Sequence, residues 1–253
     1  MKNFIGVFDS GIGGLSVLES IREILPNENI VYLADEKNCP YGTKTIEEVR
    51  QITLDNINYL KAKGAKYVVV ACNTATSSIL DVIENEENKI IGVIEPTALY
   101  AYQLSKSKKI GLFATNLTVK TNVYNTFLKN ASVFSEGCSD FVTRIEAGDF
   151  NSYELTESIK NHFEPLQGVD TLILGCTHFK FIKDSIKKIV GDINIVDSGE
   201  PTTLLLKERL LKLNLLNKND SKGLVYYETS GDLNNCINQL KKLNIIVDNI
   251  SNK

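Results

Sequence analysis

The chain has 253 residues, of which 43% are hydrophobic and 23% charged, so it is long enough for one or two globular domains with substantial cores. Its 28 basic and 31 acidic residues leave a net charge of -3, which provides no general attraction to nucleic acid or to an anionic membrane. No apolar run reaches the ~18 residues of a membrane span, and the N-terminus MKNFIGVFDSG meets an acid and glycines too early for a signal peptide. We therefore expect a cytoplasmic protein.

Seven short apolar runs predict the strands of the protein. They occupy residues 4–8, 30–34, 67–71, 90–94, 109–114, 171–175 and 193–197. Runs that are continuous rather than alternating indicate parallel strands buried on both faces. Residues 45–63 instead carry apolar side chains at helical spacing, and Thr45 with Glu48 matches a capping box at the start of this helix. The alternation predicts an α/β, doubly wound architecture, in which functional residues directly follow the strands.

Two pairs of similar segments divide the chain into halves. YVVVACNT at 67–74 resembles TLILGCTH at 171–178, and GVFDSG at 6–11 resembles IVDSG at 195–199. In the first pair an apolar run, a small residue, a cysteine and two polar residues recur about a hundred positions apart. We therefore expect two similar doubly wound parallel-sheet domains, with the active site in the cleft between them.

The chain has five cysteines, and an odd number without a secretory signal argues against a disulfide framework. Cys72 and Cys176 each follow a predicted buried strand and precede a predicted helix, whose positive end favours a thiolate. A small buried hydrophobe is the alternative interpretation of either residue, but the polar residues that follow each one favour a function. Cys39, Cys138 and Cys236 lack this setting, and we expect them to be packing or loop residues.

The segment Asp9-Ser10-Gly11-Ile12-Gly13-Gly14 follows the first predicted strand and opens a helix, so its N–H groups can cradle a small anion. Ser16 stands where a dinucleotide-binding fingerprint requires its third glycine, and no Lys-Ser/Thr pair follows. The anion is therefore better explained as a carboxylate than as a nucleotide. Asp9 lies at the mouth of this cradle and is equally compatible with a helix N-cap.

Three further residues are candidates for chemistry. His178, one of two histidines, lies two positions after Cys176, and this adjacency makes it a candidate catalytic group as well as a structural histidine. Glu146 interrupts an apolar stretch before a glycine and is equally compatible with a solvated surface acid. Tyr41 lies in a predicted loop, where it could close over a ligand. A metal site is disfavoured, because Cys72, Cys176 and His178 are not completed by a C-x-x-C or paired-histidine pattern.

Two cysteines on opposite halves suit a different reaction from one cysteine beside a histidine. The pair Cys176 and His178 alone is typical of acyl transfer. Two thiols facing one carbon can invert a stereocentre without a cofactor, since a thiolate removes the α-proton and the opposing thiol protonates the other face. The α-proton of an amino acid is weakly acidic, so donors such as Asn73, Thr74 and Thr177 would have to bind the substrate carboxylate.

The sequence resembles the glutamate racemases of the cofactor-independent aspartate/glutamate racemase superfamily over most of its length. Six blocks carry the resemblance, and the DSGIGG and CPYG segments favour the glutamate branch over the aspartate branch. In chain order the blocks are IGVFDSGIGGLSVL, YLADEKNCPYGTK, ACNTAT, GVIEPT, LILGCTHF and VDSG.

The resemblance implies a pair of α/β domains, residues 1–95 with 207–253 and residues 96–206, that enclose the substrate without a cofactor. It implies Cys72 and Cys176 as the two acid/base residues, with Asp9 assisting Cys72, His178 assisting Cys176 and Glu146 as a further assistant. The substrate-contacting residues that it implies are Asp9, Ser10, Tyr41, Gly42, Asn73, Thr74, Thr177 and His178. Residues 114–118 depart from the commoner A-T-P-G-T-like pattern, which leaves the roles of Thr115 and Thr118 open.

In this family D-glutamate supplies bacterial cell-wall peptidoglycan, and members are commonly dimers. We therefore expect a homodimer that interconverts L- and D-glutamate without a metal, a nucleic acid or a membrane. Three alternatives stay open. A related isomerase would act on aspartate, hydantoins or maleate. A cysteine hydrolase would use Cys176 and His178 without Cys72, and a carboxylate-binding module would bind its ligand without isotope exchange.

Overall fold

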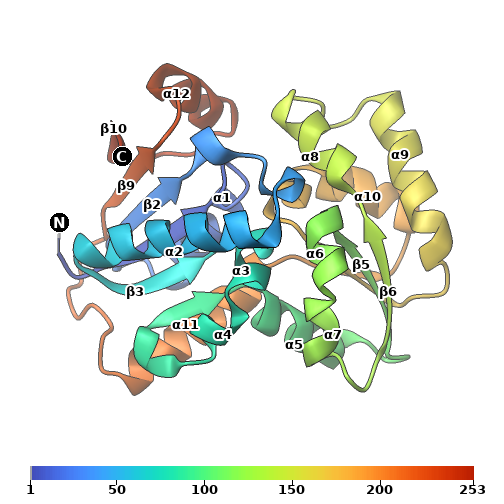
Figure 1. Cartoon of the computed structure of the whole chain (residues 1–253), viewed down its shortest axis with the longest axis horizontal. Helices are drawn as coiled ribbons and strands as arrows, with labels where there is room; N and C mark the ends of the chain where they lie inside the picture. Colours follow the sequence, from blue (N-terminus) through green and yellow to red (C-terminus); the bar gives the residue numbers. More distant parts are fainter. Residues whose placement is uncertain (1) are drawn as a thin grey trace.

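The chain folds into two parallel β-sheets that lie side by side and are covered by helices (Figure 1). The computed structural model describes residues 2–253. The first sheet has the strand order β10-β9-β2-β1-β3-β4 and the second the order β6-β5-β7-β8. In Figure 1 the first sheet combines the blue start of the chain with its red end, while the second comes from the middle of the chain. The predicted α/β architecture with two parallel sheets is confirmed.

The strands agree closely with the apolar runs in the sequence. The predicted runs 30–34, 109–114 and 171–175 coincide with β2, β5 and β7. The run 90–94 was predicted too long, because the strand ends at Gly92 and Ile94 already begins a helix. The first sheet contains β1 (Phe4–Asp9), β2 (Ile30–Ala34), β3 (Ala65–Val70), β4 (Ile90–Gly92), β9 (Val225–Thr229) and β10 (Asn249–Asn252). The second contains β5 (Lys109–Ala114), β6 (Ser132–Gly137), β7 (Thr171–Gly175) and β8 (Asn194–Val196).

Helices connect the strands and cover the sheets. The α-helices are α1 (Leu15–Ile24), α2 (Ile46–Ala62), α3 (Asn73–Ser78), α4 (Leu80–Ile83), α5 (Ile94–Leu104), α6 (Asn116–Thr121), α7 (Val123–Phe127), α8 (Ser139–Glu146), α9 (Tyr153–Phe163), α10 (Lys183–Val190), α11 (Gly199–Lys212) and α12 (Leu233–Lys242). Five short 3-10 helices are η1 (Glu36–Asn38), η2 (Tyr41–Thr43), η3 (Glu86–Asn88), η4 (Glu164–Leu166) and η5 (Thr177–Ile182). Among the described residues, no helix is long and apolar enough to cross a membrane.

Successive residues of the central strands point to opposite faces, and both faces are buried. In β1, Ile5 packs in a core with α1, α11 and α12, whereas Phe4 packs in a second core with α2 and α3. In β7, Leu172 packs with α8, α9 and α10, whereas Ile173 packs with α5 and α7. Burial on both faces explains why these strands appear in the sequence as continuous apolar runs.

The predicted capping box at the start of α2 is confirmed. Thr45 Oγ1 accepts a hydrogen bond from the Glu48 backbone N–H at 3.2 Å, and Glu48 Oε2 accepts one from the Thr45 N–H at 2.8 Å. Helix α2 lies over the first sheet and buries Val49, Ile57 and Leu60, as its helical spacing predicts. It begins at the end of the loop that follows β2, so its capping box also sets where that loop ends.

Three strands were not predicted from the sequence. β6 (SVFSEG) and β10 (NISN) are edge strands of their sheets with partly exposed residues, so neither has a continuous apolar run. β9 (VYYET) is interrupted by the buried Glu228. The two predicted domain boundaries, after residues 95 and 206, fall within α5 and α11. The assignment of those helices to one half or the other stays a prediction.

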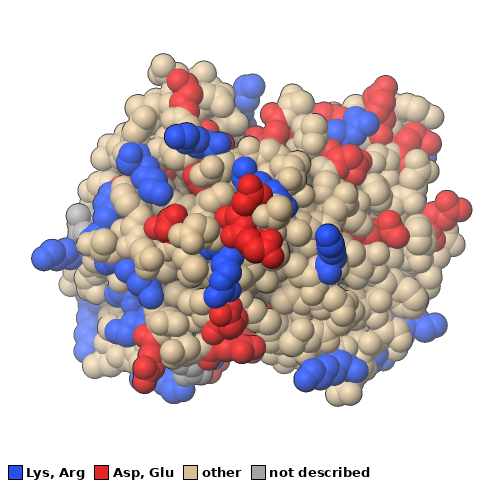
Figure 2. Space-filling model, viewed as in Figure 1, with Lys and Arg blue, Asp and Glu red and all other residues tan. Residues whose placement is uncertain are grey.

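Charged side chains of both signs are interspersed over the face shown in Figure 2. One ion pair, however, is buried. Lys66 Nζ lies 2.5 Å from Glu28 Oε2, and the two side chains are 4% and 2% exposed. The pair also holds the segment before β9, because Lys66 donates to the Leu215 carbonyl at 2.8 Å and Glu28 accepts from the Asn217 N–H at 2.7 Å. The ion pair thus joins the C-terminal part of the chain to the first sheet.

Replacing Lys66 by methionine should strongly destabilise the protein. The change leaves the Glu28 carboxylate buried without its partner, which typically lowers the free energy of unfolding by about 3–5 kcal/mol. Urea unfolding followed by circular dichroism measures the loss. Lys160→Met is the matched control, since Lys160 pairs with Glu157 on an exposed surface and its removal should leave the unfolding midpoint almost unchanged. Equal effects of the two substitutions would contradict this assignment.

Candidate active site

A cavity of about 190 Å³ lies between the two sheets, where strands of both sheets end. Cys72 lies just beyond β3, Thr115 follows β5 and Cys176 follows β7. Parallel strands bring residues that follow them to one edge of a sheet, which is why these residues gather here. The cavity is lined by Ser10, Cys39, Pro40, Tyr41, Gly42, Thr43, Cys72, Asn73, Thr74, Thr115, Ser139, Asp140, Val142, Thr143, Cys176, Thr177 and His178.

Cys72 lies on the first-sheet side of the cavity and is 6% exposed. It caps the N-terminus of α3, where its Sγ accepts a hydrogen bond from the Ala75 N–H at 3.5 Å, and its thiol contacts Ser10 Oγ at 3.8 Å. Burial raises the pKa of the Cys72 thiol above its ordinary value, and the neighbouring Asp9 carboxyl raises it further. Cys72 is therefore held as a thiol with a polar neighbour on each side.

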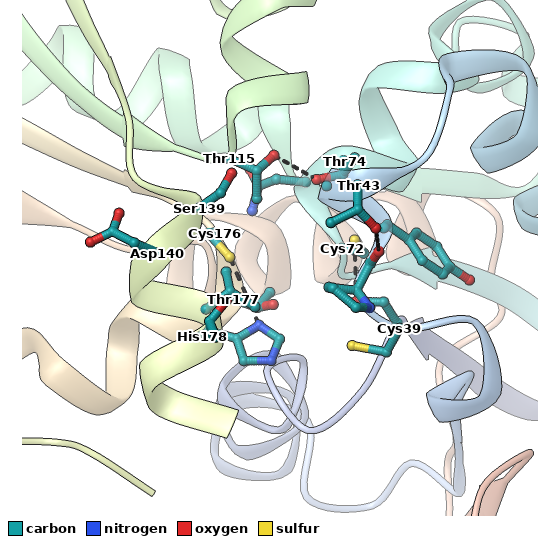
Figure 3. A pocket seen from close by; sticks show the side chains of 17 residues that line it. Cys39, Thr43, Cys72, Thr74, Thr115, Ser139, Asp140, Cys176, Thr177 and His178 are labelled. Atoms are coloured by element: carbon teal, nitrogen blue, oxygen red, sulfur yellow. Dashed lines mark hydrogen bonds between the residues drawn. The ribbon is translucent and has the colours of Figure 1, made fainter. Parts of the chain in front are cut away.

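Cys176 faces Cys72 across the cavity from the second sheet (Figure 3). The helix that follows it is the 3-10 helix η5. Its Sγ lies 3.8 Å from His178 Nδ1, and His178 Nε2 lies 2.6 Å from Glu146 Oε1. Burial alone would lower the pKa of His178, but the hydrogen bonds to Cys176 and Glu146 outweigh it and raise this pKa well above its ordinary value. The structure thus connects the Cys176 thiol, the His178 imidazole and the Glu146 carboxylate by successive hydrogen bonds.

Glu146 is the last residue of α8 and is placed by that helix beside His178. Its side chain is 32% exposed, and it is not among the residues that line the cavity. The sequence was compatible with Glu146 as a catalytic assistant or as a solvated surface acid. Its contact with His178 favours a role beside the site over that of an isolated surface acid. A protonated imidazole can donate to this carboxylate and so be fixed in orientation.

Asp9 is fully buried at the end of β1 and connects the two halves. Its Oδ2 accepts a hydrogen bond from the Gly11 N–H at 3.1 Å, and its Oδ1 accepts one from the Thr177 hydroxyl at 3.2 Å. Burial raises the pKa of Asp9 to about 6, although the charge of His178 and the loop backbone oppose the rise. Asp9 does not cap α1, whose N-cap is Gly14. The glycine loop predicted to cradle an anion thus directs N–H groups to the protein's own carboxylate.

Asn73 lines the cavity and carries an unpaired donor. Its Oδ1 accepts a hydrogen bond from the Tyr124 hydroxyl at 2.6 Å. Its Nδ2 is buried and has no hydrogen-bond partner among the described residues. Because buried polar groups are nearly always hydrogen-bonded, this unsatisfied donor is an unusual feature of a residue that lines the cavity. The other residues predicted to contact substrate, namely Ser10, Tyr41, Gly42, Thr74, Thr177 and His178, also line the cavity, whereas Asp9 lies behind its wall.

Thr115 and Thr118, whose roles the sequence left open, form a cluster of hydroxyl groups with Thr74, and Thr115 lines the cavity. Thr115 Oγ1 lies 2.9 Å from Thr74 Oγ1 and 3.0 Å from Thr118 Oγ1, and Thr74 lies 3.2 Å from Thr118 (Figure 3 shows the first pair). Thr115 directly follows β5, so its place after a strand was a usable signal. The lining residues from α8 were missed from the sequence, because β6 before them was not predicted; they are Ser139, Asp140, Val142 and Thr143.

Cys39 lies in the loop between η1 and η2, as predicted, and its side chain also lines the cavity (Figure 3). The loop after β2 folds back toward the glycine loop and turns this side chain inward. Burial raises the pKa of its thiol, as it does that of Cys72. Cys138 and Cys236 are buried in hydrophobic cores, as predicted. Within residues 2–253, no three His, Cys, Asp or Glu side chains are grouped to hold a metal ion.

Comparison with known proteins places this chain in a family. The family model of Asp/Glu/hydantoin racemases matches residues 5–203. The chain is 39% identical to the glutamate racemase of Clostridium botulinum over 248 residues, covering 94% of this chain and 96% of that one. A crystal structure of a glutamate racemase isoform from Bacillus anthracis superposes with a TM-score of 0.92 at 34% identity, covering 97% and 96% of the two chains. A glutamate racemase from Francisella tularensis in complex with D-glutamate superposes with a TM-score of 0.87 at 28% identity, covering 98% and 95%. The chain therefore belongs to the Asp/Glu/hydantoin racemase family, and it is an isomerase whose curated relatives are glutamate racemases.

Proposed function

We propose that this enzyme interconverts L- and D-glutamate by proton transfer between two cysteines, without a cofactor. The observation that carries the proposal is the pair Cys72 and Cys176, which line one small cavity from the ends of strands in two different sheets. A carbon bound between them would have one thiol on each face. Glutamate as the substrate is supported by the identity to glutamate racemases and by the relative that binds D-glutamate.

Each half of the reaction moves one proton. One cysteine, as a thiolate, takes the α-proton, and the electron pair of the broken C–H bond is left on the α-carbon and shared with the adjacent carboxylate. The other cysteine, as a thiol, gives its proton to the opposite face. The first sulfur ends as a thiol and the second as a thiolate, so the return reaction uses the same groups with exchanged roles.

The two cysteines have different assistants. Asp9 lies near Cys72, and its charge raises the pKa of the Cys72 thiol. As a carboxylate, Asp9 can accept the proton of that thiol. His178, in contact with Cys176 and oriented by Glu146, acts on the other side. A protonated imidazole can donate a hydrogen bond to the sulfur of Cys176 when the sulfur carries negative charge. Both arrangements help a sulfur to exchange its proton with a carbon acid.

The substrate carboxylate needs donors, because negative charge grows next to it as the α-carbon loses its proton. The Nδ2 of Asn73 is the one of the proposed donors that has no partner among the described residues. The hydroxyls of Thr74 and Thr177 line the cavity beside it. Ser10, Tyr41 and Gly42 form the remaining wall on the first-sheet side and complete the proposed set of contacts.

The wider role follows from the reaction. D-glutamate formed by this enzyme would supply the synthesis of bacterial cell-wall peptidoglycan in the cytoplasm. A homodimer is the assembly that we propose. The division of the chain into residues 1–95 with 207–253 and residues 96–206 is the corresponding domain proposal, in agreement with the residues that build the two sheets.

Incubation with L-glutamate in D₂O tests the reaction directly. We expect D-glutamate to appear with deuterium at the α-carbon and without any added cofactor, because the donated proton comes from a thiol that exchanges with solvent. Chiral chromatography and proton NMR follow the two changes together. Faster turnover of aspartate, a hydantoin or maleate than of glutamate would overturn the substrate assignment. Binding without any isotope exchange would indicate a carboxylate-binding module instead.

Substitution of either cysteine tests the two-base mechanism. Cys72→Ser and Cys176→Ser should each reduce racemisation by at least about 10²-fold, because a positioned proton-transfer group contributes roughly 10²–10⁴-fold. Cys138→Ser is the control, since Cys138 lies in a hydrophobic core and not in the cavity. Full racemisation by Cys72→Ser would refute the two-base mechanism, whereas a hydrolytic activity that needs Cys176 and His178 but not Cys72 would indicate a cysteine hydrolase.

The activity should depend on the ionisation of Asp9. Its raised pKa of about 6 means that the carboxylate is protonated below that pH and can no longer act as an acceptor. We therefore expect kcat/KM to fall by roughly tenfold per pH unit as the pH decreases below about 6. Asp9→Asn should lower kcat/KM at all pH values and remove this acid limb. An unchanged acid limb in the variant would assign the titration to another group.

A further inference from the structure

The loop between β2 and α2 forms one wall of the cavity but contains little regular structure of its own. Five consecutive residues of this loop line the cavity, Cys39 to Thr43. The loop has only the short 3-10 helices η1 and η2, each with three residues. Few backbone hydrogen bonds within the loop can therefore order it, and its position depends on side-chain contacts with the rest of the protein.

One buried carboxylate makes most of these contacts. Asp35 directly follows β2 and is 2% exposed. Its Oδ2 accepts hydrogen bonds from the Tyr41 hydroxyl at 2.6 Å and from Asn56 Nδ2 at 3.3 Å. Its Oδ1 accepts one from Ser230 Oγ at 2.9 Å. Asn38 Nδ2 lies 3.1 Å from Oδ1 and 2.9 Å from Oδ2.

These donors come from distant parts of the chain. Asn56 lies in α2, and Ser230 follows β9 near the C-terminal end. Ser230 Oγ also accepts a hydrogen bond from the Lys37 N–H at 3.1 Å, so it holds the loop at a second point. Lys253 Nζ donates to Asn56 Oδ1 at 2.5 Å. Asp35 therefore connects the cavity loop to α2 and to the end of the chain.

Tyr41 carries this connection into the cavity. Burial raises the pKa of its hydroxyl, and the nearby Asp35 raises it further, so Tyr41 remains a donor. A tyrosine hydroxyl has one proton, and here it is committed to Asp35. The ring of Tyr41 and the adjacent Gly42 therefore present fixed surfaces to a ligand.

We propose that Asp35 is a positioning residue, which holds Tyr41 and Gly42 in the place where they bind the substrate, with Ser230 as its support from the C-terminal segment. Asp35 does not itself line the cavity, so it acts through Tyr41. The part of the inference that concerns substrate affinity rests on the proposed function, whereas the order of the loop does not.

Asp35→Asn is the most selective test. Whichever carboxylate oxygen becomes an amide nitrogen, donors that faced an acceptor now face another donor, because both oxygens accept more than one hydrogen bond. We expect the KM for glutamate to rise by about tenfold or more while kcat changes less than about threefold, as for a lost ground-state contact. Backbone amides of residues 36–43 should also exchange with deuterium at least about tenfold faster, measured by mass spectrometry without substrate.

A second carboxylate of the same chain provides the matched control. Asp170 accepts hydrogen bonds from Ser105 Oγ at 2.5 Å, from the N–H groups of Lys106 and Ser107, and from Thr171 Oγ1. It precedes β7, whereas Cys176 follows β7, so the length of the strand separates Asp170 from the cavity. Asp170→Asn should leave both the KM and the exchange of residues 36–43 unchanged.

Ser230→Ala is the second variant, with Ser105→Ala as its control. Ser230→Ala removes one donor to Asp35 and one acceptor for the Lys37 N–H while leaving the carboxylate in place. This variant tests the proposal if Asp35→Asn does not fold. Unchanged KM and unchanged exchange in the folded variants would overturn the proposal, as would an equal rise in KM with Asp170→Asn. If the wild-type enzyme does not racemise glutamate, the proposed function fails, and the exchange experiment still decides whether Asp35 orders the loop.

Discussion

The two halves of the site meet where a loop from each sheet approaches so closely that only glycine fits. A methyl group on Gly13 would lie 2.4 Å from Thr177 Oγ1, 2.7 Å from His178 Nδ1 and 2.9 Å from the His178 backbone nitrogen. This approach brings Thr177 within hydrogen-bond distance of Asp9, whose carboxylate belongs to the other sheet. This contact is one of those that hold the two sides of the cavity together.

The two cysteines that line the cavity have different ionisable neighbours. Around Cys72 the neighbours are a buried acid and a serine hydroxyl, and burial raises the pKa values of both Cys72 and Asp9. Around Cys176 the neighbour is an imidazole whose pKa is raised well above its ordinary value and whose other nitrogen is held by a partly exposed carboxylate. In the proposed mechanism, each arrangement provides a nearby group whose charge can respond when a sulfur gains or loses a proton.

The C-terminal segment is part of the first half of the protein and not an appendage. β9 extends the first sheet beside β2, and the buried Lys66–Glu28 pair holds the chain that leads into it. Ser230, just after β9, then reaches the loop that forms the cavity wall. The last part of the chain thereby influences a site whose cysteines lie far from it in sequence, since parallel strands need not be neighbours along the chain to be neighbours in a sheet.

The sequence by itself determined the strands that are buried on both faces, because continuous apolar runs such as those of β2, β5 and β7 have few other uses. It also determined the candidate thiols, since Cys72 and Cys176 stand in the same setting after strands, and the capping box that begins α2. The edge strands β6 and β10 were not predicted from the sequence, because a half-exposed strand needs no continuous apolar run. Only the tertiary structure decided that Cys39 lines the cavity and that Asp35 contacts the loop that forms its wall. Their roles depend on contacts such as Asp35 with Ser230, between residues far apart in the chain, and local sequence patterns carry no information about such distances.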